Sequence, residues 1–147
     1  MINILPAQEA SKAVVEAFFG EHWHKQTDKD DLYKFGRFIE MKGEKLGFFA
    51  LVPCENKEGW LRTLYFKEDF SPAMIMLGID WIKEAAQQAG LKRIYAFSHS
   101  SSTDTLFKSW GFENSDDQPK SITASVDKQG NWWMLPTYLS TAVDKSC

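Results

Sequence analysis

The side chains with the most chemical capacity gather in one short stretch, where a histidine stands among serines. His99 has a serine on each side, and Asp104 follows five residues later. An imidazole titrates near neutral pH, so His99 is a candidate general base. Hydrolysis by a Ser-His-Asp triad is not predicted, because the sequence lacks the Gly-x-Ser-x-Gly motif that exposes a nucleophilic serine. The alternative for His99 is an exposed turn residue without a catalytic role.

Tyr95 is a second candidate, since a phenol can donate a proton to a leaving group. It lies in the apolar run 94–97, which is typical of a strand whose successive side chains face opposite sides. Tyr95 is therefore either a catalytic acid or a packed aromatic residue. Glu40, Glu55 and Glu58 are conceivable bases for an amine, but each is expected in a solvated strand or turn.

His22 and His24 have the one spacing in the sequence that suggests a metal site. On a helix two residues at this spacing point in different directions, whereas on a strand they share a face. No cysteine or paired carboxylate follows at ligand spacing. We therefore predict that the protein binds no metal.

The composition favours one globular domain. The chain has 147 residues, of which 44% are hydrophobic and 25% are charged. This length suits a single core, which we place within residues 1–140, with a loose tail over 141–147. The formal net charge is −3, and no dense cluster of Lys and Arg marks a nucleic-acid surface.

The cellular compartment is predicted from the lack of a membrane-spanning run and of a secretory signal in the sequence. No apolar run approaches the roughly 20 residues that cross a bilayer, and the first residues do not resemble a secretory signal. The two cysteines, Cys54 and Cys147, fit a reducing compartment. We expect a cytoplasmic protein that binds neither membrane nor nucleic acid.

Hydrophobic periodicity predicts both strands and helices. Strands are expected over residues 2–5, 35–42, 45–54, 60–67, 91–98, 121–127 and 131–139, helices over 8–19, 71–90 and 101–111, and a short helix or a loop over 28–34. Alternation in one strand predicts that four side chains share a face: Leu46, Phe48, Ala50 and Val52.

The helix 71–90 has the clearest start and stop signals. Ser71 is a strong N-cap, Pro72 fits the first helical position, and Gly90 fits the end. Apolar residues at helical spacing form its buried stripe: Ile75, Ile79, Ile82 and Ala86.

The shorter helix is expected to begin at Ser101. Asp104 stands at the third position, as in a weaker variant of the capping box. Gly111 ends the helix, and Phe112 can fold back onto it.

Trp132 and Trp133 are consecutive residues of the last predicted strand. Consecutive strand residues face opposite sides, so one indole is expected in the core and the other at the surface. A surface tryptophan there would indicate a protein partner or a homodimer contact.

Two stretches of the sequence are similar to the GCN5-related N-acetyltransferase (GNAT) superfamily. The stretch Gly90-Leu-Lys-Arg-Ile-Tyr-Ala-Phe, a polar turn, and then Leu106-Phe-Lys-Ser-Trp-Gly-Phe112 resemble the family's GLKRIYL…LYEKLGF. Leu64-Tyr-Phe-Lys-Glu-Asp-Phe70 resembles its LYVHPDY. The resemblance covers residues 60–113. It implies an α/β (α+β) fold with a mixed, mostly antiparallel central sheet of about six or seven strands flanked by about three or four helices.

The resemblance also implies a function, which is transfer of an acyl group from acetyl-CoA or another acyl-CoA to an amine of a small molecule or a protein. In that family the edge of the strand that includes Leu64, Tyr65 and Phe66 binds pantetheine through the backbone. Ser71 and Ser100 would be the other cofactor contacts. Phe107 aligns with a family tyrosine that protonates the leaving thiolate, so His99 or Tyr95 would have to replace that acid.

The expected phosphate loop, residues 67–73, contains no glycine, whereas the family's loop is glycine-rich. Pro72 has no N–H to donate to a phosphate, and Ser71 can cap the next free donor. Glu68 and Asp69 add negative charge where a diphosphate would arrive. The loop departure and the phenylalanine at position 107 motivate an alternative, a GNAT-fold protein without catalysis that binds a protein partner, as in a virus-encoded module.

Overall fold

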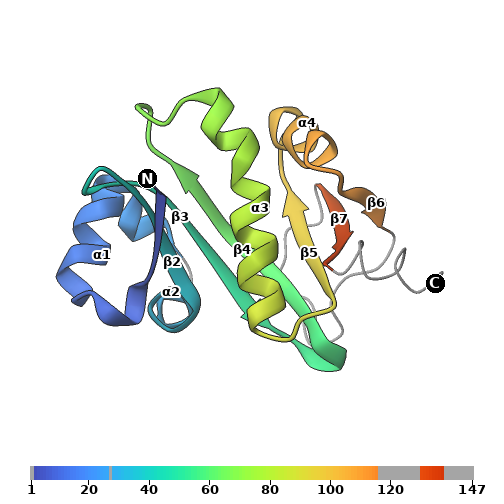
Figure 1. Ribbon diagram of the computed structural model, residues 1–147, viewed down its shortest axis with the longest axis horizontal. Helices are drawn as coiled ribbons and strands as arrows, with labels where there is room; N and C mark the ends of the chain where they lie inside the picture. The colour runs from blue at the N-terminus through green and yellow to red at the C-terminus, as the bar shows by residue number, and fades with distance from the viewer. Residues whose placement is uncertain (1, 27, 116–129, 138–147) are drawn as a thin grey trace.

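The computed structural model describes residues 2–26, 28–115 and 130–137 (Figure 1). Four α-helices are present in this part: α1 Lys12–Phe19, α2 Lys29–Phe35, α3 Pro72–Gln88 and α4 Ser101–Ser109. Three short 3-10 helices accompany them: η1 Ala7–Glu9, η2 Gly20–Lys25 and η3 Glu55–Lys57. The strands are β1 Ile2–Pro6, β2 Gly36–Met41, β3 Glu44–Pro53, β4 Glu58–Phe66, β5 Arg93–Ser98, β6 Glu113–Ser115 and β7 Asn131–Pro136.

The strands form one seven-stranded sheet in the order β1-β2-β3-β4-β5-β7-β6. Every neighbouring pair is antiparallel except β4 and β5, which run parallel and are joined through α3. The predicted fold class, a mixed and mostly antiparallel sheet with flanking helices, is confirmed. No helix in residues 2–26, 28–115 and 130–137 is long and apolar enough to cross a membrane.

Helices cover both faces of the sheet, and each layer encloses its own core. Figure 1 shows α3 lying across the face of the sheet that is turned toward the viewer, with α4 beside it. Buried residues of α3 and α4 share a core with one face of β3, β4, β5 and β7; among them are Phe49, Ile82, Ile94, Phe107 and Trp133. Residues of α1 and α2 pack on the opposite face, against Phe38, Phe48 and Ala50. The sheet therefore lies between two helical layers, α3 and α4 on one face and α1 and α2 on the other.

The prediction that Leu46 shares a face of its strand with Phe48 and Ala50 is wrong. Phe48 and Ala50 do share the core under α1 and α2, but Leu46 lies in the core under α3. The register between β2 and β3 shifts between Ile39 and Glu40, which makes Leu46 an extra residue. Such a β-bulge turns the side chain to the other face, and local alternation in the sequence does not reveal it.

The start and end of α3 are as predicted. Ser71 Oγ accepts a hydrogen bond from Met74 N at 3.2 Å, and Pro72 is the first helical residue. Gly90 adopts φ +77° beyond the last turn, and Leu91 N donates to Ala86 O at 2.9 Å. This left-handed position favours glycine, which has no side chain to strain there.

The start of α4 differs by one residue from the prediction. Ser100, not Ser101, is the N-cap, and its Oγ accepts from Thr103 N at 3.2 Å. Asp104 instead accepts a hydrogen bond from the Trp133 indole. Ser100, Ser101 and Ser102 are consecutive, so local sequence offers several equivalent caps.

The other expected elements hold with small changes. The predicted helix 8–19 is divided into η1 and α1, because Ser11 caps α1 at Val14 N. The expected short helix or loop at 28–34 is the helix α2, which begins one residue later, at Lys29, and ends at Phe35. The strand 131–139 is present as β7, whereas the strand 121–127 and the tail lie outside the described residues.

Candidate functional site

The parallel strands β4 and β5 pair only along their first halves. Their register begins at Glu58 with Arg93 and ends at Leu61 with Ala96. The register between β3 and β4 shifts just there, and Arg62 is the extra residue. A bulge bends its strand, so β4 turns away from β5, and Figure 1 shows their C-terminal ends pointing apart. Within the described chain, residues 63–66 pair with no strand on this side, although β3 pairs with them on the other.

This unpaired edge has the backbone groups that an extended molecule needs as hydrogen-bond partners. Backbone N–H groups of an open strand edge donate hydrogen bonds to an added extended chain, and its C=O groups accept them. The N-terminus of α3 and a hollow lined by Tyr65, Lys67, Glu68 and Asp69 lie at the same end of β4. The open edge, the hollow and the helix start therefore form the candidate site.

The loop that leads into α3 is held by an aromatic anchor. Phe70 is buried and its ring stacks on Phe66, with 5.5 Å between centroids. Phe70 N donates to Lys67 O at 3.0 Å, which closes a tight turn. Glu68 and Asp69 are exposed at its tip. The turn thus presents two carboxylates, and one amide donor in the first turn of α3, that of Met74, already binds Ser71 Oγ.

The predicted cofactor residues on β4 are half-buried on alternate faces. Leu64 and Phe66 pack against the core under α3, whereas Tyr65 packs against the core of α1 and α2. The Tyr65 ring stacks on Phe19 at 5.5 Å and meets His22 at 5.7 Å. These side chains hold the strand in place, which leaves the backbone as the part that a ligand can reach from the β5 side.

The two predicted catalytic residues lie on β5 and just beyond it. Tyr95 is 4% exposed and lies within the paired part of the strand. His99 is exposed after the strand end, with its ring 4.8 Å from that of Phe97. Ser98 is buried, and its hydroxyl donates to Ser100 O at 2.9 Å. Of these groups, His99 is the one that solvent and a ligand can reach.

The remaining predicted candidates lie elsewhere in the fold. Glu58 was expected in a solvated turn but is 5% exposed, and it pairs with Arg93 at 3.6 Å, because β4 begins earlier than predicted. Glu40 pairs with Lys45 at 3.6 Å, and Glu55 is exposed in η3. Over the described ranges no three His, Cys, Asp or Glu side chains gather into a group that could hold a metal ion.

The tryptophan pair divides as predicted. Trp133 is 6% exposed in the core under α3, so it cannot contact a partner at the surface. Trp132 is half-exposed on the other face, where its ring meets Phe97 at 5.2 Å, Trp60 at 6.2 Å and Tyr95 at 6.4 Å. We call these four rings the aromatic floor.

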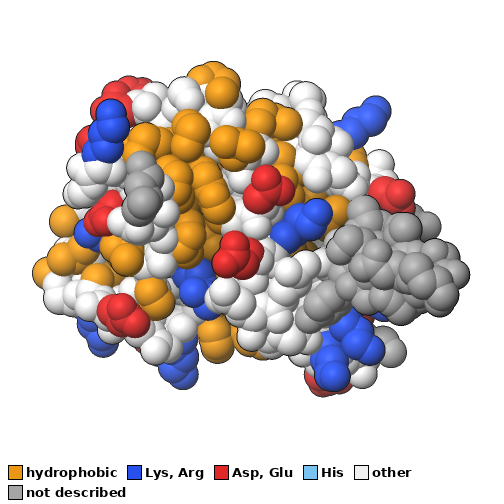
Figure 2. Space-filling view, in the orientation of Figure 1, with side chains coloured by type: hydrophobic (Ala, Val, Ile, Leu, Met, Phe, Trp, Pro, Cys, Tyr) orange, Lys and Arg blue, Asp and Glu red, His pale blue; other side chains and the backbone are white. Residues whose placement is uncertain are grey.

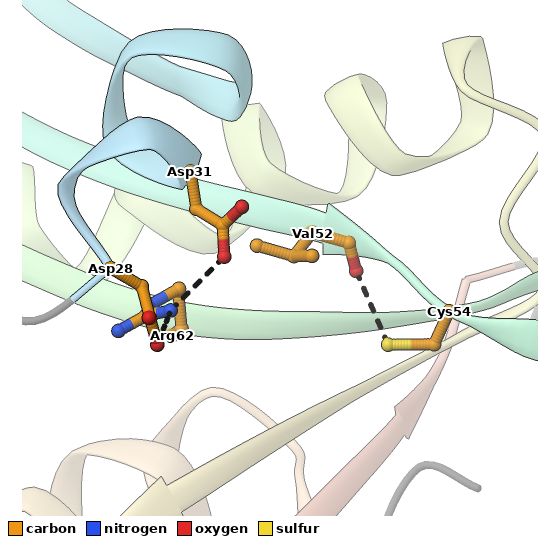
Figure 3. A network of polar contacts seen from close by, with 5 residues as sticks. All are labelled: Asp28, Asp31, Val52, Cys54 and Arg62. Carbon is orange, nitrogen blue, oxygen red and sulfur yellow. Dashed lines mark hydrogen bonds and ion pairs between the residues drawn. The ribbon is translucent and has the colours of Figure 1, made fainter. Parts of the chain in front are cut away.

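Sequence reasoning did not single out Arg62. Its side chain is 8% exposed, and Figure 3 shows it below the start of α2, with Nη1 3.3 Å from Asp28 and 3.2 Å from Asp31. Its guanidinium also lies over the Trp60 ring, 4.9 Å from the centroid. The signal in the sequence is a lone arginine in an apolar strand, which is costly to bury without an acidic partner.

Solved structures provide the comparison for this arrangement. An N-acetylglutamate synthase from Neisseria gonorrhoeae, complexed with coenzyme A and N-acetyl-glutamate, matches 93% of this chain at 15% identity with a TM-score of 0.76; this chain spans 35% of that protein. A GNAT-family acetyltransferase from Staphylococcus aureus Mu50 matches 93% of this chain and 99% of its own at 14% identity, with a TM-score of 0.67. The Campylobacter jejuni N-acetyltransferase PseH, in complex with acetyl coenzyme A, matches 92% and 99% at 17% identity, with a TM-score of 0.64.

These likenesses establish the fold. The chain has the fold of the GNAT acetyltransferases, as the resemblance in residues 60–113 implied. No protein-family model and no curated protein matches the chain in sequence. At 14–17% identity the fold is shared while side chains have diverged, so the chemistry has to be argued from this chain's own site.

Proposed function

We propose that the protein transfers an acyl group from an acyl-CoA to an amine. The observation that carries the proposal is the divergence of β4 and β5 after Leu61 and Ala96, which leaves an open strand edge beside the start of α3. Pantetheine is an extended chain with two amide groups, and it can add to such an edge as a strand would.

The reaction needs little more than proximity. The amine nitrogen attacks the thioester carbon, a C–N bond forms, the C–S bond breaks, and the thiolate leaves while the amine loses a proton. His99 is the proposed acceptor of that proton, because it is exposed at the end of β5, near the opening between the C-terminal ends of β4 and β5. Phe107 is buried and has no proton to give, so the leaving thiolate must take its proton from another group or from water.

Solved structures of the same fold support the cofactor. The matching proteins from Neisseria gonorrhoeae and Campylobacter jejuni are described in complex with coenzyme A and acetyl coenzyme A. In this chain, the backbone of Leu64, Tyr65 and Phe66 would hold the pantetheine, and Ser100 lies across the opening at the start of α4.

The turn at 67–71 makes diphosphate binding weak in this proposal. Ser71 and Pro72 leave few donors at the start of α3, and two carboxylates stand at the tip of the turn. Binding should then come mostly from pantetheine rather than from the nucleotide.

A binding protein without catalysis is the competing proposal, and a surface feature favours it. Met76 and Leu77 of α3 are 44% and 48% exposed, and Figure 2 shows hydrophobic side chains gathered on the face that carries α3. Exposed apolar patches of this kind often bind a partner.

Calorimetry and a thiol-release assay distinguish an acyltransferase from a binding protein without catalysis. The protein should bind acetyl-CoA and S-acetylpantetheine with dissociation constants within about tenfold of each other, and ADP far more weakly, since the edge of β4 provides most of the contacts. Incubation with acetyl-CoA and a panel of primary amines should release free CoA thiol only when an amine is present. Absence of both heat and thiol release at millimolar acetyl-CoA would reject acyl transfer and favour the binding protein.

A further inference from the structure

The aromatic floor is on the face of the sheet opposite α3. Ile94, Ala96 and Trp133 lie in the core under α3, so the residues between and beside them, Tyr95, Phe97 and Trp132, face the other way. Their ring contacts with each other, and that of Trp132 with Trp60, confirm a continuous surface across β4, β5 and β7.

The floor begins where the two parallel strands separate. Trp60 pairs with Tyr95 one position before the last pair, and Phe97 lies one position after it. Trp60, Phe97 and Trp132 are partly buried, and Arg62 covers one face of the Trp60 ring, so Phe97 and Trp132 are the rings that a ligand can reach. Trp132 meets Phe97 edge to face, with 63° between the ring planes, so the two rings offer a planar apolar group both a ring face and a ring edge to pack against.

The group of charged side chains beside Trp60 carries net negative charge. Arg62 lies over Trp60 and is matched by two carboxylates, Asp28 and Asp31, which leaves one negative charge in the group. The Asp28 side chain is 71% exposed, so this charge faces solvent. An alkyl amine is protonated at neutral pH, and such a rim attracts it while it repels a carboxylate.

We propose that the acceptor is an arylalkylamine, a primary amine on a short chain attached to an aromatic ring, and that its ring lies on the aromatic floor. The inference rests on the proposed acyl transfer and names its substrate class. The ring stacks beside Trp132 and Phe97, the ammonium approaches past Asp28, and the amine nitrogen, once deprotonated, is directed toward the gap between β4 and β5.

Steady-state kinetics with matched acceptors tests the assignment. Acetyl-CoA is the donor, and the acceptors are 2-phenylethylamine, n-butylamine and phenylalanine, which differ by the ring or by an added carboxylate. The kcat/KM for 2-phenylethylamine should exceed each of the other two by at least about tenfold, which corresponds to about 1.4 kcal/mol.

Variants show whether the floor causes the preference. Trp132→Leu should raise the KM for 2-phenylethylamine by about three- to tenfold and leave n-butylamine nearly unchanged. Met76→Leu, on the outer side of α3, is the matched control and should change neither. Trp132→Phe keeps a ring, so it should retain most of the preference and shows that loss of folding is not the cause.

The outcomes separate this inference from the function itself. Equal kcat/KM for the aromatic and aliphatic amines, or a preference that survives in Trp132→Leu, overturns the acceptor class while acyl transfer stands. Faster reaction with phenylalanine than with 2-phenylethylamine overturns the charge argument and with it the assignment. Transfer to no amine, despite bound acetyl-CoA, overturns both proposals.

Discussion

The Trp133 indole Nε1 donates a hydrogen bond to Asp104 Oδ1 at 3.0 Å, and this bond joins β7 to α4. The two residues are 29 positions apart in sequence. Trp133 also packs against Phe107 of the same helix, with 6.4 Å between ring centroids. The beginning of α4, which follows the C-terminal end of β5, is therefore positioned by β7, which pairs with β5 on the side away from β4.

Replacing Asp104 with Ala should destabilise the protein. The indole N–H is part-buried and would lose a charged acceptor, so the free energy of unfolding should fall by about 1.5–3 kcal/mol. Urea denaturation measures the change. Asp80→Ala, an exposed position on α3, is the control and should stay within about 0.5 kcal/mol of the parent. If Asp104→Ala is as stable as this control, the hydrogen bond contributes nothing to α4.

Arg62→Met should loosen the attachment of α2 to β4. The change removes the cation between Asp28 and Asp31, which are partly exposed, so we expect a loss of about 1–3 kcal/mol rather than the roughly 3–5 kcal/mol of a fully buried pair. Lys45→Met breaks the pair with Glu40, whose cation is 30% exposed against 8% for Arg62, and should cost at most about 1 kcal/mol. Hydrogen exchange should also show faster exchange in α2 for Arg62→Met alone, and equal exchange in both variants would contradict the attachment.

Two glycines should respond to alanine in opposite directions. A Cβ at Gly78 would lie 3.5 Å from the Trp110 ring, an ordinary contact, so Gly78→Ala should stabilise α3 by about 0.5–1 kcal/mol. A Cβ at Gly36 would overlap the Phe48 ring and the Leu32 carbonyl, so Gly36→Ala should destabilise by more than about 2 kcal/mol. Thermal unfolding of the two variants checks both signs, and a change of the same sign in both would be inconsistent with this packing.

The double variant Glu68→Gly with Pro72→Gly should improve binding of CoA. It removes one carboxylate from the turn and adds one backbone donor at the start of α3, and we expect about tenfold tighter binding by calorimetry. S-acetylpantetheine has no diphosphate, so its affinity should not change. Glu55→Gly, an exposed position in η3, controls for loss of charge alone. Unchanged CoA affinity would mean that the shape of the turn, rather than its charge and missing donor, limits binding.

Local signals in the sequence predicted the elements that they control directly. Ser71 with Pro72 marked the start of α3, Gly90 marked its end, and the apolar stripe with Ile79 and Ile82 is buried as expected. Capping and helical periodicity act over a few residues, so one sequence is enough to recognise them. The same reasoning misplaced the start of α4 by one residue, because Ser100 and Ser101 are equivalent locally.

The candidate site could be predicted only in part. The edge at Leu64, Tyr65 and Phe66 was expected as a cofactor contact, and the structure shows that β5 leaves this edge open. Arg62 was not expected, because nothing near it in sequence reveals Asp28 and Asp31 as its partners. Glu58 was expected in solvent, yet pairing with β5 buries it beside Arg93.

The sequence by itself determined the order of the elements, the caps of α3 and the absence of glycine from the turn at 67–73, because these depend on backbone preferences of adjacent residues. Tertiary structure alone decided where β4 bends from β5, that Leu46 faces α3, and that Trp60, Tyr95, Phe97 and Trp132 form one surface. Strand register and bulges are set by contacts between segments far apart in the chain, and a pattern within one strand carries no record of them.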